Sequence, residues 1–564
     1  MSLSGCVWQQ QASTKDEIIS QLVKETAYSP AVIKILYQRG ITQAADITEF
    51  LNPKLTTLTS PFDLPDMAKA VERVMQAKAQ GEKVAVFGDY DVDGITGTIV
   101  LLEALRKIGI TAEYYIPHRH DEGYSLNAEA IHKLHAQGVA VLVTVDCGIS
   151  KVSEVELANQ LGITVIITDH HNPSAELPPA YAVVDPKLGD AVKVRDLSGV
   201  AVAFKFAWAL YRSAGISGDS EIKEALDLVG LGTIADISPL VYENRILAAF
   251  GLRYLSDSRR PGIRALKEIA GVTDPVNAHA VSFFLAPRLN AAGRVAHAEL
   301  AVELLLAQNE TEAKERALAL NRLNGERQAL GSAVAEAADS QVKEVGDFLF
   351  LSGEGWHPGV IGIVASGLAD KYSRPTILVA VENGQGKGSA RGIPGFNLFG
   401  FLESAKELFQ DFGGHENACG FTIASGQIRI LESRLNAAFP QWAGENIFSP
   451  KIAVDAELTP EEISMSLAAE IALLEPFGNG NPPPVFLTRD LKLLEIRPVG
   501  KGDHVQVKLG SGERVMEGIG FGWGRKLKSL RVADIVDMLF HLEIDRFRNR
   551  EKVRLRIVDM DKRG

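Results

Sequence analysis

Three acidic residues directly follow a short apolar run in residues 84–98, VAVFGDYDVDGITGT. Asp89, Asp91 and Asp93 alternate with uncharged residues, and alternate side chains of an extended chain share one face. The spacing therefore predicts three carboxylates on one side of the chain. Carboxylates at such a short separation repel one another, which favours a shared proton or a cation between them. Because clustered oxygen ligands suit a hard divalent cation, the stretch predicts a metal site; a solvated acidic turn is the alternative.

Later segments carry acids or imidazoles after similar apolar runs. Asp146 follows VLVTV, Asp169, His170 and His171 follow TVIIT, and Asp236 follows LVGLGTIA. A single Asp is common at strand ends and helix caps, and a single His more often has a structural role. Two adjacent His after an Asp are difficult to bury together, and imidazole is a frequent metal ligand. Since open α/β sheets gather their chemistry at the carboxyl ends of the strands, we expect these groups to converge at one sheet edge.

The elements that must position these groups form an α/β pattern. Between residues 83 and 185, short β-branched runs alternate with helical segments, which predicts a mostly parallel sheet covered on both faces. A second α/β pattern begins at residue 347. Strands with turns follow from about residue 445, which favours a small antiparallel β-barrel of the oligonucleotide-binding (OB) kind. The predicted domains are a helical lead-in (1–80), a catalytic α/β domain (81–300), a long connecting helix (301–345), a second α/β domain (346–444) and a C-terminal barrel (445–564).

Length and composition set the broad class. The chain has 564 residues, which is too long for one core, and 46% of them are hydrophobic. No apolar run is long enough to cross a bilayer, and no export signal is recognisable, so we expect a cytoplasmic protein without membrane attachment. Cys6, Cys147 and Cys419 are too few and too far apart for a disulfide framework or a zinc module. The net charge of −12 argues against a general nucleic-acid coat but not against a local basic groove.

The motifs DYDVDG, TVDCGI, TDHH and GTIADISPL, in this order, resemble the DHH phosphoesterase superfamily. The resemblance implies two bound divalent cations, Mn²⁺ or Mg²⁺, with the ligands Asp91, Asp93, Asp146, His170 and Asp236. Several small-molecule members have a His four residues before the first ligand of the D-x-D motif, where this chain has Phe87. Asp89 is expected to compensate, either as a ligand or as a neighbour of one. We give Asp89 and His171 catalytic roles, with His171 either orienting a ligand or contacting phosphate.

Two further segments are candidates for substrate contacts near these motifs. RLNAAGR, residues 288–294, resembles the corresponding segment of the RecJ single-strand exonucleases within the superfamily. Its small residues let the backbone approach a ligand, and Arg288, Asn290 and Arg294 suit phosphate. The polar stretch 116–127 offers Arg119 and Tyr124 as contacts to phosphate or base; an ordinary connecting loop is the alternative.

The second α/β region carries WHPG, SARG and GGHENACG in that order, as in the DHH-associated domain of RecJ-like proteins. Glycines beside basic side chains predict a nest for a phosphate or a terminal nucleotide. The candidate residues are Trp356, His357, Ser389, Arg391 and His415. Cys419 is interpreted as a small buried residue, because no partner for a nucleophilic thiol is recognisable around it.

Basic residues alternate near the C-terminus, in RFRNREKVRLR. An extended chain would turn all of them to one side, where with Phe547 they would form a surface for a nucleic-acid strand. The residues are Arg546, Arg548, Arg550, Lys552, Arg554 and Arg556. The alternative is a solvated strand face beside a hairpin turn at Asn549.

Resemblance to the RecJ exonucleases spans nearly the whole chain. It implies a 5′-to-3′ exonuclease that degrades single-stranded DNA to 5′-mononucleotides in DNA repair and recombination. A cleft between two lobes would admit one strand and refuse a duplex. A single-strand-binding protein and a helicase are the implied partners, and a monomer would suffice. One alternative is a phosphodiesterase for short oligonucleotides or small phosphate substrates, which the barrel and Phe87 disfavour. The other is a non-catalytic DNA-binding scaffold, which the retained acids disfavour.

Overall fold

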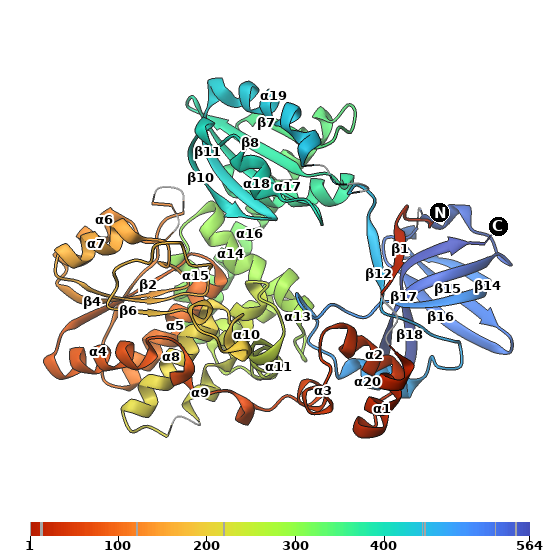
Figure 1. Cartoon of the computed structure of the whole chain (residues 1–564), viewed down its shortest axis with the longest axis horizontal. Coiled ribbons are helices and arrows are strands. Elements are labelled where there is room, and N and C mark those ends of the chain that lie inside the picture. The colour runs from red at the N-terminus through yellow and green to blue at the C-terminus, as the bar shows by residue number, and fades with distance from the viewer. Residues whose placement is uncertain are drawn as a thin grey trace. The chain divides into compact units, whose positions relative to one another are not determined.

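The structure is a computed structural model that describes residues 2–11, 15–119, 122–123, 125–217, 220–442, 444, 447–524, 526–547 and 550–563. Its residues form two compact units. The parallel-sheet unit consists of Asp16–Asn324 and Glu470–Pro483. The barrel unit consists of Met1–Lys15, Gly325–Ala469 and Pro484–Gly564. Many elements of both units are labelled in Figure 1.

A five-stranded, wholly parallel sheet forms the centre of the parallel-sheet unit, with the strand order β3-β2-β4-β5-β6. The strands are β2 (Lys83–Gly88), β3 (Glu113–Tyr115), β4 (Val139–Val145), β5 (Thr164–Thr168) and β6 (Ala182–Val184). Their near-continuous apolar runs are buried, as expected of a parallel sheet covered on both faces. The predicted sheet is therefore confirmed.

Helices cover both faces of this sheet (Figure 1). On one face, Phe87, Leu142 and Ile167 pack against α6 (Ala128–Ala136) and α7 (Val152–Gln160). The opposite face packs in one large core against α4 (Met67–Gln80), α5 (Val92–Lys107) and α8 (Gly199–Ser213). The two cores clamp β2 and β4 between them, so the loops that leave these strands start from rigid positions.

A tight turn connects β2 to α5, and two glycines make it possible. A Cβ atom on Gly88 would lie 2.0 Å from Oγ1 of Thr98, and one on Gly94 would lie 2.6 Å from the backbone N of Asp89. Any larger residue at either position would push the strand away from the helix. Asp89 and Asp91 lie between these two points and are held by them.

Further helices complete the parallel-sheet unit. Three lie before the sheet: α1 (Asp16–Thr26), α2 (Pro30–Gln38) and α3 (Ala44–Leu51). The others are α9 (Glu221–Glu224), α10 (Leu226–Ala235), α11 (Tyr242–Ser256), α12 (Pro261–Ala270), α13 (Ala278–Ala280), the π-helical turn η5 (Val281–Leu285), α14 (Ala286–Val295) and α15 (Glu299–Leu306). The long helix α16 (Glu310–Gln341) runs from this unit into the barrel unit, as predicted for the connecting segment.

Arg245 on α11 is a buried cation that ties distant segments together. Its guanidinium donates hydrogen bonds to the carbonyl oxygens of Phe50 (3.0 Å), Leu474 (2.7 Å) and Leu473 (2.8 Å). It also lies 3.9 Å from the centre of the Phe50 ring. Burial, together with the charge of Arg39, lowers the pKa of Arg245 to about 9. The side chain therefore fastens α3 and the segment after α20 (Met465–Ala472) to α11.

Replacing Arg245 with Met should lower the free energy of unfolding by about 3 kcal/mol, because three carbonyl groups would lose their donor. Urea unfolding followed by circular dichroism measures the change. Arg253→Met, at an exposed position of the same helix, is the control and should change stability by less than about 0.5 kcal/mol. Equal effects of the two substitutions would contradict this account of Arg245.

The barrel unit contains a second α/β sheet with the order β10-β11-β9-β8-β7, in which only β7 and β8 are parallel. Stacked Phe348, Phe396 and Phe439 form the centre of its core. The elements are β7 (Leu349–Glu354), α17 (Pro358–Tyr372), β8 (Thr376–Glu382), β9 (Gln385–Arg391), α18 (Leu398–Glu403), β10 (Phe409–His415), β11 (Ala418–Ala424) and α19 (Ile428–Ala438).

The C-terminal strands form a closed barrel. Sheet order is β14-β15-β16-β18-β17, and β17 pairs again with β14, so the five strands leave no open edge. The strands are β14 (Phe486–Val499), β15 (His504–Ser511), β16 (Arg514–Gly520), β17 (Ile535–Phe547) and β18 (Arg550–Lys562). The short β13 (Ala456–Glu457) adds to β14 in parallel. The predicted barrel is confirmed.

A short strand at the start of the chain adds to the barrel unit: β1 (Val7–Gln10) pairs in parallel with β12 (Lys451–Val454). Local sequence in the predicted helical lead-in gave no sign of this pairing, whose partner lies far along the chain. Among the residues that the structure describes, no helix combines the length and the apolar character that a membrane span requires.

Candidate metal centre

The three acids after β2 converge through a turn, because β2 ends at Gly88 and α5 begins at Val92. Asp91 is the N-cap of α5 and accepts hydrogen bonds from the backbone N–H groups of Asp93 (3.0 Å) and Gly94 (3.2 Å). Asp93 already lies in the first turn of the helix. The prediction of an extended chain with three carboxylates on one face is therefore wrong. A strand that turns directly into a helix brings the acids together instead.

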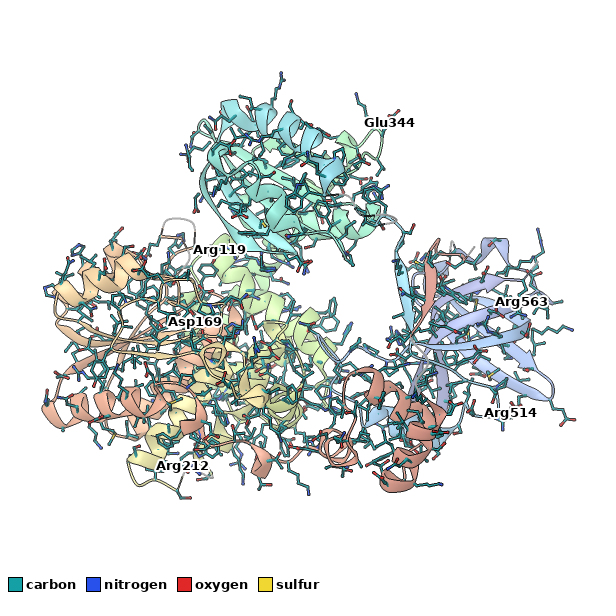
Figure 2. The ribbon with its side chains drawn as sticks, in the orientation of Figure 1. Arg119, Asp169, Arg212, Glu344, Arg514 and Arg563 are labelled. Atoms are coloured by element: carbon teal, nitrogen blue, oxygen red, sulfur yellow. The ribbon has the colours of Figure 1, made fainter. Side chains whose placement is uncertain are left out.

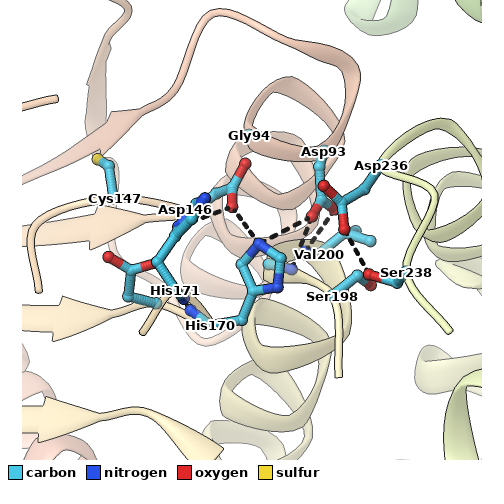
Figure 3. A network of polar contacts seen from close by, with 12 residues as sticks. Asp93, Gly94, Asp146, Cys147, His170, His171, Ser198, Val200, Asp236 and Ser238 are labelled. Atoms are coloured by element: carbon cyan, nitrogen blue, oxygen red, sulfur yellow. Dashed lines mark hydrogen bonds and ion pairs between the residues drawn. The ribbon is translucent and has the colours of Figure 1, made fainter. Parts of the chain in front are cut away.

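The start of α8 holds Asp93 in place. Its buried carboxylate accepts hydrogen bonds from the backbone N–H groups of Gly199 (2.7 Å) and Val200 (2.8 Å), as Figure 3 shows. These are orphan donors of the first helical turn, where the positive end of the helix dipole also favours a negative charge. Ser198, the N-cap residue, makes this helix start at the right place.

Asp146 follows β4 and has a backbone φ of 63°, a conformation that non-glycine residues seldom adopt. A Cβ atom on Gly199 would lie 2.6 Å from Cβ of Asp146, so only glycine fits at the start of α8.

The imidazole of His170 lies between two acids (Figure 3). Its Nε2 atom is 3.0 Å from Oδ1 of Asp146 and 3.9 Å from Oδ2 of Asp93.

Asp236 joins the cluster of Asp93, Asp146 and His170 from the end of a helix. It is the C-cap residue of α10 and accepts a hydrogen bond from the hydroxyl of Ser238. Candidate ligand atoms of Asp93, His170 and Asp236 all lie within 4.8 Å of one another. The apolar run before Asp236 is thus a buried helix, whereas Asp89, Asp146 and Asp169 directly follow strands.

Among the residues that the structure describes, three overlapping groups of side chains could each hold a cation, with ligand atoms within 4.8 Å inside each group. They are Asp89 with Asp91 and Asp146; Asp93 with His170 and Asp236; and Asp146 with His170 and His171. Oδ1 of Asp89 is buried and has no hydrogen-bond partner among the described residues. Carboxylate oxygens are the preferred ligands of Mn²⁺ and Mg²⁺, and the first two groups consist of carboxylates with at most one imidazole, so they fit such ions.

Electrostatics also favours cations here. Burial raises the pKa of each of four carboxyl groups, and the charge of a neighbouring aspartate raises it further; they are Asp89, Asp91, Asp93 and Asp146. Burial lowers the pKa of His170 to about 4, so its imidazole is neutral, the form that binds metals. The site without metal therefore retains protons that a bound cation would replace.

Binding of Mn²⁺ to the metal-free protein should release protons at pH 7. Titration calorimetry in buffers with different ionisation enthalpies measures the number released. We expect the release of at least about one proton per protein molecule. An apparent binding enthalpy that does not depend on the buffer would contradict the raised pKa values of the aspartates.

Asp169, which lies under the two histidines, is a site residue whose role the sequence did not reveal. Its buried carboxylate accepts hydrogen bonds from the backbone N–H groups of Ile149 (3.0 Å), His170 (2.7 Å) and His171 (3.1 Å). It also lies 2.7 Å from Nδ1 of His171. Burial opposes the charge of Asp169, but the contacts with His171 outweigh it and lower the pKa of Asp169 to about 2. Asp169 therefore orients the imidazole of His171 and holds the backbone of both histidines.

Burial alone would lower the pKa of His171, but the hydrogen bond and charge of Asp169 raise it to about 9. In metal-free protein we therefore expect His171 to stay protonated at pH 8, and Asp169→Asn to lower its pKa. NMR titration of ¹⁵N-labelled histidines measures both. The contribution of the pair to the free energy of unfolding should be complete below pH 6.5 and lost as the pH rises to about 9. An unchanged His171 pKa in the variant would contradict this pairing.

A cavity of about 320 Å³ opens over these acids. Its lining brings together predicted site residues from several elements: Asp89, Asp91, Asp146, His171, Asp236, Arg119, Asn290 and Arg294. The side chain of Asn290 accepts a hydrogen bond from the backbone N–H of Val92 (3.1 Å), which joins α14 to α5. Arg119 lies 4.9 Å from the centre of the Tyr90 ring. Figure 2 labels Arg119 and Asp169 on this unit.

Some predicted contacts lie elsewhere. Arg288 is absent from the described lining of the cavity, and its guanidinium donates to the carbonyl of Phe284 (2.7 Å) and the side chain of Asn321 (3.0 Å). It therefore holds two helices together. Tyr124 and Arg548 lie outside the described residues, as does the side chain of Arg550.

The residues of the predicted phosphate nest lie on several elements of the second α/β sheet. A Cβ atom on Gly362 of α17 would lie 3.0 Å from both Ser389 and Arg391, so the helix packs directly on these side chains. His357 is the N-cap of α17. The ring of Trp356 is buried in the core beside α17, which favours a packing role. His415 lies exposed on β10, separated from β9 by β11.

The basic residues that alternate along β18 form ion pairs with acids of neighbouring strands. Arg554 pairs with Glu543 and Asp545, each at 3.2 Å, and Lys552 pairs with Glu517. Arg546 belongs to β17 and not to β18, so the predicted single row of six basic residues is wrong. Figure 2 shows other arginines of the barrel, including Arg514 and Arg563.

The fold and the acid–histidine cluster define the class of protein: a DHH phosphoesterase. The DHH family N-terminal domain matches residues 83–233, the DHHA1 domain matches 341–440 and the RecJ OB domain matches 454–559.

Two curated relatives, both named single-stranded-DNA-specific exonuclease RecJ, match nearly the whole chain. The protein of Bacillus subtilis is 37% identical over 99% of this chain and 71% of its own length. The protein of Escherichia coli is 34% identical over 95% of this chain and 97% of its own. The crystal structure of RecJ from Thermus thermophilus in complex with Mn²⁺ is 30% identical, with a TM-score of 0.86 over 99% of this chain and 80% of that one. The chain belongs to the RecJ family.

Proposed function

We propose that this protein is a metal-dependent exonuclease that hydrolyses single-stranded DNA from the 5′ end and releases 5′-mononucleotides, in DNA repair and recombination. One observation carries the proposal: acids and an imidazole from β2, α5, β4, β5 and α10 meet beneath one cavity in a chain of the RecJ family. The closed barrel supports a polymeric substrate, because barrels of this kind bind single strands.

The proposed metal ligands are Asp91, Asp93, Asp146, His170 and Asp236, and Asp89 is either a further ligand or a neighbour of one. Two ions are supported by two of the ligand groups, which meet through the contact between Asp146 and His170. These groups are Asp89 with Asp91 and Asp146, and Asp93 with His170 and Asp236. When bound, divalent ions would polarise the scissile phosphate and favour deprotonation of the attacking water.

The chain's own residues then position the substrate. Asp169 keeps His171 charged and aimed at the cavity, where an imidazolium can contact a phosphate oxygen. Arg119 and Arg294 line the same cavity and can hold neighbouring phosphates, while Asn290 fixes α14 to the start of α5.

Contacts farther along the strand are proposed for the barrel unit. His357, Ser389 and Arg391 are candidates around the start of α17, and His415 is one on β10. On the barrel, Lys552 and Arg554 would have to exchange acidic partners for phosphates. Tyr124, Arg288, Arg548, Arg550 and Trp356 stay predictions. So do the single-strand-binding protein and the helicase as partners, the monomeric state and the cytoplasmic location.

The test uses Mn²⁺ and DNA oligonucleotides labelled at either end, in single-stranded and blunt duplex form. We expect single strands to lose mononucleotides from the 5′ end and blunt duplexes to persist. Degradation from the 3′ end would contradict the polarity, and equal degradation of duplexes would contradict the substrate. Failure to release nucleotides from any single strand would leave a DNA-binding scaffold as the better account.

A further inference from the structure

A second cavity lies among the helices of the parallel-sheet unit, away from the metal centre. Its volume is about 880 Å³, against about 320 Å³ for the cavity over the metal ligands, and the described linings of the two share no residue. The lining comes from α5, α8, α9, the end of α11 and the loop before α12. A volume of this size is typical of sites for small organic ligands.

A network of ion pairs fixes one wall of this helix-lined cavity. The guanidinium of Arg260 donates to both carboxylate oxygens of Glu103 (2.6 and 2.8 Å) and to the carboxylate of Asp227 (3.2 Å). The hydroxyl of Ser258 also donates to Asp227 (2.7 Å). These charges are therefore compensated within the protein, and their side chains have fixed positions.

The remaining charges of the lining are mostly positive. Lys107 pairs with Glu221 (3.5 Å) and Glu224 (3.2 Å). The other charged side chains of the lining are exposed and form no ion pair with a described residue; they are Arg106, Lys223, Arg253, Arg259 and Asp257. Because four of these are basic and one is acidic, the cavity favours an anion, and arginine is well suited to phosphate.

Aromatic side chains complete the lining. Tyr254 on α11 is 37% exposed, whereas Phe204 and Tyr211 on α8 present rings from the core. Within the described part of the chain, the hydroxyl of Tyr211 makes no hydrogen bond. Burial and the charges of nearby glutamates raise the pKa of Tyr211 to about 12, so the hydroxyl stays a donor at neutral pH. Aromatic faces, a hydroxyl donor and arginines together suit a nucleoside that carries phosphate.

Three helices that pack on one another connect the helix-lined cavity with the metal centre (Figure 1). On α5, Arg106 follows Asp93 by thirteen residues, about 20 Å of helix axis. α10 has Asp227 in its first turn and ends at its C-cap, Asp236. α8 holds Asp93 through its first backbone N–H groups and carries Tyr211 near its other end. A ligand in this cavity therefore contacts the far ends of the helices that position the metal ligands.

We propose that the helix-lined cavity is an effector site for a nucleoside phosphate and that its occupant strengthens the binding of divalent cations at the metal centre. A ligand that joins the ends of three helices also restricts their other ends, so less freedom is lost when a cation binds. The cation should strengthen ligand binding by the same factor. The inference does not depend on the proposed hydrolysis, because both affinities are measured without DNA.

The first test measures binding of deoxyadenosine 5′-monophosphate to the full chain in EDTA by titration calorimetry, with inorganic phosphate as the second probe. The variants are Arg106→Ala and Arg259→Ala, both at exposed positions. Arg212→Ala is the matched control, because Arg212 lies exposed at the end of α8, over the ring of Trp208 (4.9 Å) and outside the described lining (Figure 2). Arg294→Ala detects binding in the cavity over the metal ligands instead.

We expect one nucleotide per protein with a Kd below about 1 mM, and each of the two variants should weaken binding about tenfold. Arg212→Ala and Arg294→Ala should change the Kd less than about twofold. Inorganic phosphate should bind at least about tenfold more weakly than the nucleotide, because it lacks the base. No saturable binding, a loss confined to Arg294→Ala, or equal affinity for inorganic phosphate would overturn the site.

The second test measures Mn²⁺ affinity through the electron paramagnetic resonance signal of the free ion, corrected for the ion that the nucleotide itself binds. At a nucleotide concentration that saturates the wild type, the affinity should rise about fivefold. Arg106→Ala should keep the wild-type affinity without nucleotide and show a much smaller rise with it. An unchanged or lower Mn²⁺ affinity of the wild type would overturn the effector role, and so would a rise of equal size in Arg106→Ala.

Discussion

Asp146→Asn is expected to lower kcat/KM for single-stranded DNA with Mn²⁺ by about 10³-fold, which corresponds to about 4 kcal/mol of transition-state stabilisation. Asp146 belongs to two of the three groups of candidate ligands and contacts His170 at 3.0 Å. Asparagine keeps the shape of the side chain but removes the charge that two cations would share.

The same substitution should not destabilise the metal-free protein. Burial and the charge of Asp93 raise the pKa of Asp146, which means that the charged form is unfavourable in the folded state without metal. We therefore expect an equal or higher thermal midpoint in EDTA, together with a smaller gain on addition of Mn²⁺. Asp257→Asn, at an exposed position of the same unit, should change neither property. A variant that keeps full activity would remove Asp146 from the metal centre.

Glu243→Ala should lower the free energy of unfolding by about 3–5 kcal/mol, because it leaves a buried ammonium group without its partner. Glu243 on α11 lies 2.7 Å from Nζ of Lys205 on α8, and both side chains are almost completely buried. Lys205 also donates to the carbonyl of Thr59 (2.8 Å), whose backbone N–H donates to Glu243 (2.7 Å). Burial lowers the pKa of Lys205, because a charge without a partner is unfavourable at this position.

Urea unfolding measures this effect, and a double variant separates charge from packing. Lys205→Met combined with Glu243→Leu should recover most of the lost stability, since it removes both charges. Glu49→Ala, which breaks a partly exposed pair with Lys193, is the control and should cost less than about 1 kcal/mol. A loss below 1 kcal/mol for Glu243→Ala would contradict the importance of the buried pair. Because α8 also holds Asp93, weaker metal binding should accompany the loss.

Much of the parallel sheet and of the cation site could be predicted from the sequence, because the apolar runs and the acids that follow them are local signals. Asp146, His170 and Asp236 converge as expected. The predicted place of Asp93 in an extended strand was wrong, because hydrophobic alternation does not reveal where a strand turns into a helix. The role of Asp169 was not predictable, because it depends on backbone N–H groups of Ile149, His170 and His171 and on the ring of His171 in three dimensions.

Partners that are far apart in sequence explain the remaining differences. The acids that pair with Lys552 and Arg554 lie on β16 and β17. The local sequence around these two basic residues therefore did not reveal that they form ion pairs in the barrel. β1 was not predicted because its partner, β12, follows more than four hundred residues later. Likewise, Arg288 has the side chain expected of a phosphate contact, but its partners are Phe284 and Asn321.

Anomalous diffraction at the manganese edge, from crystals of this protein grown with Mn²⁺, tests the metal centre most directly. Two peaks are predicted: one among Asp89, Asp91 and Asp146, and one among Asp93, His170 and Asp236. Mn²⁺ bound only outside these side chains, or no bound Mn²⁺ at a concentration that supports hydrolysis, would contradict the account.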